Sequence, residues 1–123
     1  MFGRAVQRVN TSKRGLPDDA HAKTMIFIQF EAMPTQVVAA RDNVAGAYVN
    51  CWIQSNDAVQ AEARGRQWIS DQGWIVVSVK QYRAVDVHAE TRGPDSEYVL
   101  EALKADGSIV FHRWSPDSEA RAN

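Results

Sequence analysis

The chain has 123 residues but only one cysteine, Cys51, and three histidines. A single cysteine excludes an intrachain disulfide, and the scattered histidines have none of the ligand spacings of a zinc site. The seven glycines form neither a GxGxxG loop nor a GxxxxGK[ST] phosphate loop, and the chain contains no G-x-S-x-G turn of a serine hydrolase. We therefore expect no cofactor and no metal.

Long apolar runs and a strong net charge are also absent. No stretch approaches the ~20 apolar residues that cross a bilayer, and the N-terminus lacks the apolar region of a signal peptide. Residues 1–24 carry five basic and two acidic side chains, a net charge of +3, whereas residues 25–123 carry nine basic and thirteen acidic, a net charge of −4. An acidic body disfavours the phosphate backbone of nucleic acid. We expect a cytoplasmic protein without membrane contact.

The composition indicates one globular domain, since 45% of the residues are hydrophobic and 24% are charged. Residues 1–23 show neither helical nor strand periodicity, which predicts a disordered tail with a basic character. The domain is expected over residues 24–115, and residues 116–123 form a second tail. Met25 directly precedes the first strand pattern and is an alternative start of the protein.

Period-2 alternation predicts strands over residues 25–32, 46–54, 74–82 and 108–114. Helical spacing predicts helices over residues 58–71 and 95–105, and leaves a short helix open within residues 33–43. Residues 86–94 are expected to be mainly a loop. Gly65 lies on the apolar stripe of the first long helix, which predicts that this helix closely approaches the sheet.

This order of elements predicts an α+β fold. We expect a two-layer sandwich in which a four-stranded sheet carries both helices on one face. The nearest common architecture is ferredoxin-like, or a variant of it, because the order β-β-α-β-α-β departs from β-α-β-β-α-β.

The two faces of the expected sheet differ in composition. One face is aliphatic and is predicted to be the core: Ile26, Ile28, Phe30, Val49, Cys51, Ile53, Ile75, Val77, Val79, Ile109 and Phe111. In that setting Cys51 is expected to be a buried core residue rather than a nucleophile. The opposite face, here called the aromatic face, is the predicted binding face: Phe27, Gln29, Tyr48, Trp52, Trp74, Tyr82, His112 and Trp114.

Three polar residues on this aromatic face come from three different strands, and they are Glu31, Asn50 and His112. A carboxylate close to an imidazole raises the pKa of the imidazole, so such a trio could bind a polar group or move a proton. The competing interpretation is that the three side chains only hydrogen-bond within an interface or at a sheet edge.

Three short runs carry a resemblance: AYVNCWI at 47–53, GWIVV at 73–77 and VFHRW at 110–114. Together with the alanine-rich helix between them, they resemble small bacterial proteins of unknown function over residues 25–114. The resemblance includes no catalytic motif and so implies no activity.

A sheet face with this many aromatic side chains is rarely left bare. The sequence therefore predicts an interaction module, a homodimer that packs through the aromatic face and holds any small-ligand pocket there. Two other functions stay open, a small enzyme that uses Glu31, Asn50 and His112, and a sheet that stacks single-stranded RNA. A further alternative is that residues 33–43 or a terminal tail cover the rings internally.

Overall fold

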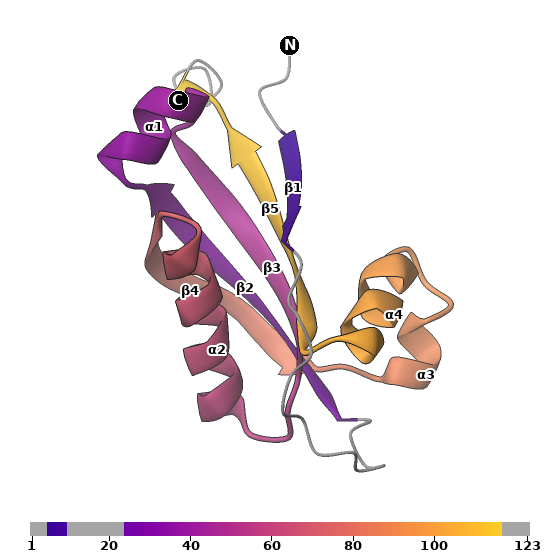
Figure 1. The fold of residues 1–123 in the computed structure, drawn as a ribbon. Coiled ribbons are helices and arrows are strands. Elements are labelled where there is room, and N and C mark those ends of the chain that lie inside the picture. The colour runs from indigo at the N-terminus through magenta and orange to yellow at the C-terminus, as the bar shows by residue number, and fades with distance from the viewer. Residues whose placement is uncertain (1–4, 10–23, 117–123) are drawn as a thin grey trace.

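The computed structural model describes residues 5–9 and 24–116, which build one antiparallel sheet and four helices (Figure 1). The strands are β1 (Ala5–Val9), β2 (Met25–Pro34), β3 (Gly46–Gln54), β4 (Trp74–Ala84) and β5 (Gly107–Trp114), in the spatial order β1-β5-β3-β2-β4. The helices are α1 (Gln36–Asp42), α2 (Ala58–Asp71), α3 (Val87–Glu90) and α4 (Ser96–Lys104). The predicted α+β class is confirmed. A helix follows each of β2, β3 and β4, whereas the ferredoxin-like order is β-α-β-β-α-β.

The helices begin and end at residues that satisfy their terminal backbone groups. The Asp57 carboxylate accepts hydrogen bonds from the first turn of α2, and the Thr35 hydroxyl does the same for α1. Gly73 follows α2 with φ +86°, a left-handed conformation that glycine adopts without steric cost. The short helix left open within residues 33–43 is present as α1. Part of the expected loop 86–94 forms α3, which Asp86 caps.

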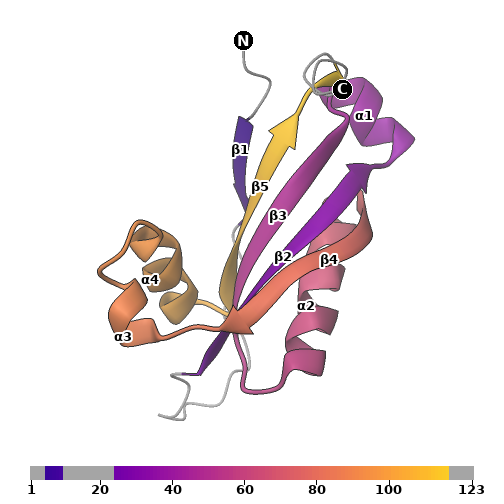
Figure 2. The same ribbon diagram turned by 180° about the vertical axis from the view of Figure 1, so that it is seen from behind.

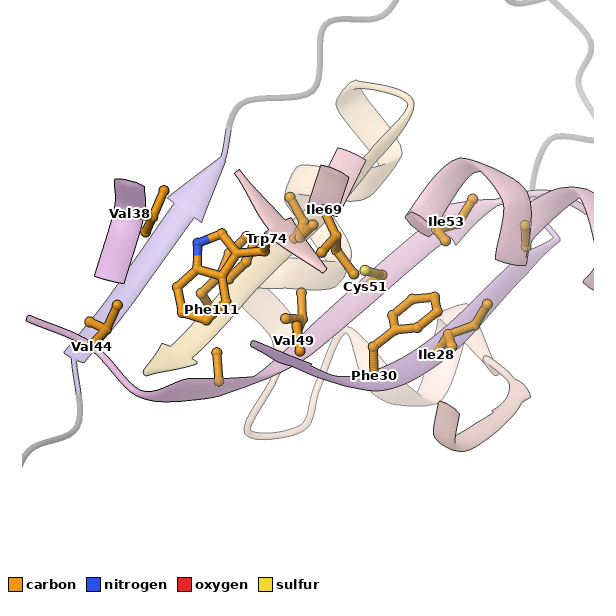
Figure 3. Packing of buried hydrophobic residues seen from close by; sticks show 14 residues of the cluster. Ile28, Phe30, Val38, Val44, Val49, Cys51, Ile53, Ile69, Trp74 and Phe111 are labelled. Carbon is orange, nitrogen blue, oxygen red and sulfur yellow. The ribbon is translucent and has the colours of Figure 1, made fainter. Parts of the chain in front are cut away.

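The main core lies between the sheet and helices α1 and α2 (Figure 3). It contains Ile28, Phe30, Ala32, Val38, Val44, Ala47, Val49, Cys51, Ile53, Ala61, Ile69, Trp74, Ile109 and Phe111. Alternate residues of β2, β3 and β5 supply the sheet side, as the aliphatic pattern predicts. Gly65 lies directly over the Phe30 ring, so the expected close approach of α2 to the sheet is confirmed.

A second core lies on the opposite face of the sheet, beneath α4. Trp52 is 1% exposed; its ring stacks on Tyr98 of α4 at 5.1 Å between centroids and tilts against Phe27 at 5.0 Å. The Gln54 amide donates hydrogen bonds of 2.6 and 2.7 Å to the carbonyls of Ala102 and Ala105, and so fixes the end of α4. The prediction that both long helices cover one face was therefore wrong. An amphipathic stripe shows that a helix is buried but not which face of a sheet it covers.

Strand β4 departs from simple alternation because its register with β2 shifts twice, between Gln29 and Phe30 and between Glu31 and Ala32. At each shift β4 contains one extra residue. One extra residue moves every side chain beyond it to the opposite face of the sheet. Two shifts restore the original side, so Trp74, Val76 and Tyr82 share one side of β4 and Val79 joins them between the shifts. Trp74 packs in the main core against Phe111, with Val76 and Val79 beside that core. Two residues expected in the core, Ile75 and Val77, are instead exposed.

Residues 5–9 form the edge strand β1, although the sequence predicts a disordered tail there. They pair with β5 from Ala5 opposite Arg113 to Val9 opposite Ile109. The rest of both expected tails lies outside the described residues, except Pro116, so the domain limits at residues 24 and 115 stay predictions.

The contact beneath Gly65 can be tested with Gly65→Ala. A β-carbon would lie 2.8 Å from Cε2 of the fully buried Phe30 ring, which would have to move. Overpacking costs about 1–3 kcal/mol, and the higher helix propensity of alanine offsets only about 1. We expect a net loss of about 1 kcal/mol in urea unfolding. Gly93→Ala is the matched control, because its nearest heavy atom would be 3.7 Å away. A Gly65→Ala chain more stable than wild type would contradict the contact.

The second core can be tested at Trp52. Trp52→Ala would empty a site closed on both sides, and we expect it to lower the free energy of unfolding by about 3–5 kcal/mol. Trp52→Phe should cost less than half of this. It keeps an aromatic ring between Phe27 and Tyr98, and the lost indole N–H has no hydrogen-bond partner among the described residues. Equal losses in the two variants would contradict the stacked arrangement.

Candidate interaction surface

Helix α4 covers only one end of the second face of the sheet, and the other end stays uncovered by any described helix (Figure 2). We call this uncovered part the open surface. It consists of Gln29, Glu31, Tyr48, Asn50, His112 and Trp114, supplied by the three strands β2, β3 and β5. All six side chains are partly exposed. The open surface is the part of this face that the described helices leave uncovered.

Strand register arranges the open surface in cross-strand rows. Tyr48 of β3 stands opposite Glu31 of β2 on one side and opposite His112 of β5 on the other. In the neighbouring row, Asn50 stands opposite Gln29. Residues opposite each other in antiparallel strands share a face, so the register brings together the polar and aromatic residues predicted for it.

An aromatic pair forms the apolar part of the open surface. The rings of Tyr48 and Trp114 lie 5.1 Å apart at an angle of 50°. Trp114 stands opposite Gly46, and the indole ring occupies the space above that glycine. A β-carbon at position 46 would lie 2.8 Å from Cε2 of the Trp114 ring. The absence of a side chain at Gly46 is therefore what allows the ring to lie flat on the sheet.

Two interactions pair polar groups of the open surface. The Gln29 side-chain amide donates a hydrogen bond of 2.9 Å to Oδ1 of Asn50. The Glu31 carboxylate forms an ion pair of 3.6 Å with Nζ of Lys80, on the neighbouring strand β4. This part of the surface can therefore meet an apolar partner with some of its polar groups already satisfied.

Glu31, Asn50 and His112 share this surface but do not form one polar site. Tyr48 stands between Glu31 and His112, and two strand spacings separate their backbones by about 10 Å. The ion pair with Lys80 draws Glu31 toward β4, away from β5. The register thus keeps the Glu31 carboxylate and the His112 imidazole apart, although general acid–base catalysis by this pair requires them to be in contact.

Four residues of the predicted aromatic face lie elsewhere. Phe27 and Trp52 are buried beneath α4, and Trp74 belongs to the main core. Tyr82 is 52% exposed but stands opposite Ile28, on the main-core side of the sheet. Internal cover, which the sequence left open, is therefore present. Helix α4 covers Phe27 and Trp52, and Trp74 shares the main core with Val38, which belongs to residues 33–43.

Sequence reasoning missed two apolar side chains beside the open surface. Met33 of β2 is 48% exposed, and its cross-strand partner Ile75 of β4 is 50% exposed. Met33 follows Glu31 at period two, so simple alternation could have placed it on this face. Alternation along β4 instead predicts Ile75 in the core, because the sequence does not show that Ile75 pairs with Met33 and Trp74 with Pro34.

Two other kinds of functional feature are absent from the described part of the chain. It holds no group of three histidine, cysteine or acidic residues that could bind a metal ion, and none of its helices is long and apolar enough to cross a membrane. No family model, curated protein or solved structure matches the chain. The resemblance of residues 25–114 to small bacterial proteins therefore stays a prediction.

The single thiol offers a test of the burial beneath α2. Cys51 is fully buried in the main core, and burial raises the pKa of its thiol far above the ordinary value. Because the thiolate is the reactive form, we expect no reaction of the folded protein with an aromatic disulfide reagent at neutral pH. One equivalent should react after unfolding in denaturant. Rapid reaction of the native protein would contradict the buried position of Cys51.

Proposed function

We propose that this chain is a small interaction module and that two copies pack through the open surface to form a homodimer. The observation that carries the proposal is the partly exposed pair Tyr48–Trp114, flanked by the half-exposed Met33 and Ile75. Tyrosine, tryptophan and methionine are enriched at interfaces because they bury a large area, and the aromatic pair keeps polar groups at the ring edges.

The electrostatics of the chain are compatible with contact between two copies. The formal net charge is −1, so two chains repel each other weakly. Glu31 is already paired with Lys80 within its own chain, and a twofold contact would not bring an uncompensated carboxylate against its copy. Any small-ligand pocket would form at the junction of the two surfaces.

The geometry gives less support to the two alternative functions. An enzyme would need Glu31 to reach His112, and Tyr48 stands between them. RNA binding would need free cations beside the rings, but Lys80, the nearest described lysine of this face, is paired with Glu31. We therefore propose self-association rather than chemistry or base stacking.

The homodimer can be tested with Tyr48→Lys. The new ammonium would lie between Glu31 and His112 in a partly exposed row, which the folded monomer can accommodate. In a dimer it would bury a charge at the contact and weaken association by about tenfold or more. We expect light scattering after gel filtration to show an assembly of at least two copies for wild type and a smaller species for Tyr48→Lys.

The matched control is Val37→Lys, which places the same charge at a residue of α1 that is 72% exposed and lies away from the open surface. It should leave the mass unchanged, and circular dichroism should show that both variants are folded. A wild-type protein that stays monomeric up to submillimolar concentration, or a Tyr48→Lys chain with unaltered mass, would refute the proposed contact.

A further inference from the structure

The sheet has two outer strands, β1 on one side and β4 on the other. On one side β1 is short and pairs with β5 over five residues. On the other side β4 pairs with β2 alone, and no other strand in the described residues lies along its outer edge (Figure 2). An outer strand presents backbone N–H and C=O groups that can pair with another chain. With eleven residues against the five of β1, β4 is therefore the longer of the two open edges of the described sheet.

The first half of β4 lacks charge and proline, two of the features that protect an edge strand, and its one protective feature is the register shift at Val77. Five of its six residues, WIVVSV at 74–79, are apolar β-branched or aromatic residues. Ile75 is 50% exposed and Val77 is 54% exposed. Charged residues begin only at Lys80. An uncharged, β-prone and exposed segment of this kind favours pairing with another strand.

We propose that the outer edge of β4 pairs antiparallel with β4 of a second copy of this chain. Two identical strands related by a twofold axis satisfy each other's backbone groups, and every described pair in this sheet is already antiparallel. Charge also favours a second copy. Lys80 and Arg83 are neutralised within their own chain by Glu31 and Glu90, so the two edges meet without unpaired positive charge.

This contact goes beyond the proposed homodimer because it uses a different surface and a different axis. An antiparallel edge contact has its twofold axis perpendicular to the sheet, so the open surfaces of both copies lie on the same side. A face-to-face contact through the open surface has its axis parallel to the sheet. If the two twofold axes intersect, they generate a closed tetramer with D2 symmetry. A chain that uses both contacts in this way reaches four copies.

The edge contact can be tested in the full chain with Val77→Lys. Each copy would then place an ammonium against the paired edge, which should raise the dissociation constant of this contact about tenfold or more. Val77→Thr keeps the β-branched shape and should raise the constant by a smaller factor. Val59→Lys, at a residue of α2 that is 79% exposed, is the matched control and should change nothing. Hydrogen exchange should show amides of residues 74–79 becoming protected as protein concentration rises.

The edge and face contacts can be separated by combining Val77→Lys with Tyr48→Lys. If both contacts form, light scattering shows a wild-type tetramer, a dimer for each single variant and a monomer for the double variant. A wild-type dimer lost only in Val77→Lys supports the edge contact and refutes the face contact. A wild-type dimer lost only in Tyr48→Lys, with concentration-independent exchange in residues 74–79, overturns the edge contact. A monomeric wild type overturns both.

Discussion

The fold depends on how strand β3 is buried. At one end of β3 helices cover both faces of the sheet, and at the other end they cover only one face. Val49, Cys51 and Ile53 pack into the main core, and Trp52 fills the second core on the opposite face. Beyond Trp52 toward the start of β3, α4 no longer covers the strand, and Tyr48 is only partly buried. The point at which α4 stops therefore decides where the stabilising core ends and where the surface available to a partner begins.

Helix α4 is held at this point by specific interactions as well as by apolar burial. Tyr98 stacks on Trp52, and the Ser108 hydroxyl donates a hydrogen bond of 2.7 Å to the Tyr98 carbonyl. Gln54 satisfies two carbonyls at the end of the helix. Arg83 of β4 lies over the Phe27 ring and forms an ion pair with Glu90. This ion pair joins α3, the short helix before α4, to the sheet. These contacts keep the second core closed and leave the open surface as the accessible remainder of that face.

The arrangement of β4, with its two register shifts, decides which of its side chains lie in the core and which are exposed to a partner. The shifts bring Val79 to the same side of β4 as Trp74 and Val76, and Trp74 packs in the main core against Phe111. Ile75 pairs with Met33 on the opposite face and Val77 lies at the second shift, and both are exposed along an outer strand. Apolar side chains therefore continue from the Tyr48–Trp114 pair through Met33 and Ile75 to the edge of the sheet. This continuity is why both proposed contacts use adjoining parts of one molecule.

The sequence by itself determined the α+β class, the two long helices, the aliphatic core residues of β2, β3 and β5, and the close approach at Gly65. These follow from local periodicity and capping, which are properties of neighbouring residues. Only the tertiary structure decided that α4 covers Phe27 and Trp52, that Trp74 belongs to the main core, that Tyr48 separates Glu31 from His112, and that residues 5–9 add a strand. Each of these depends on strand order and register, which pairings between distant residues establish and which no local pattern contains.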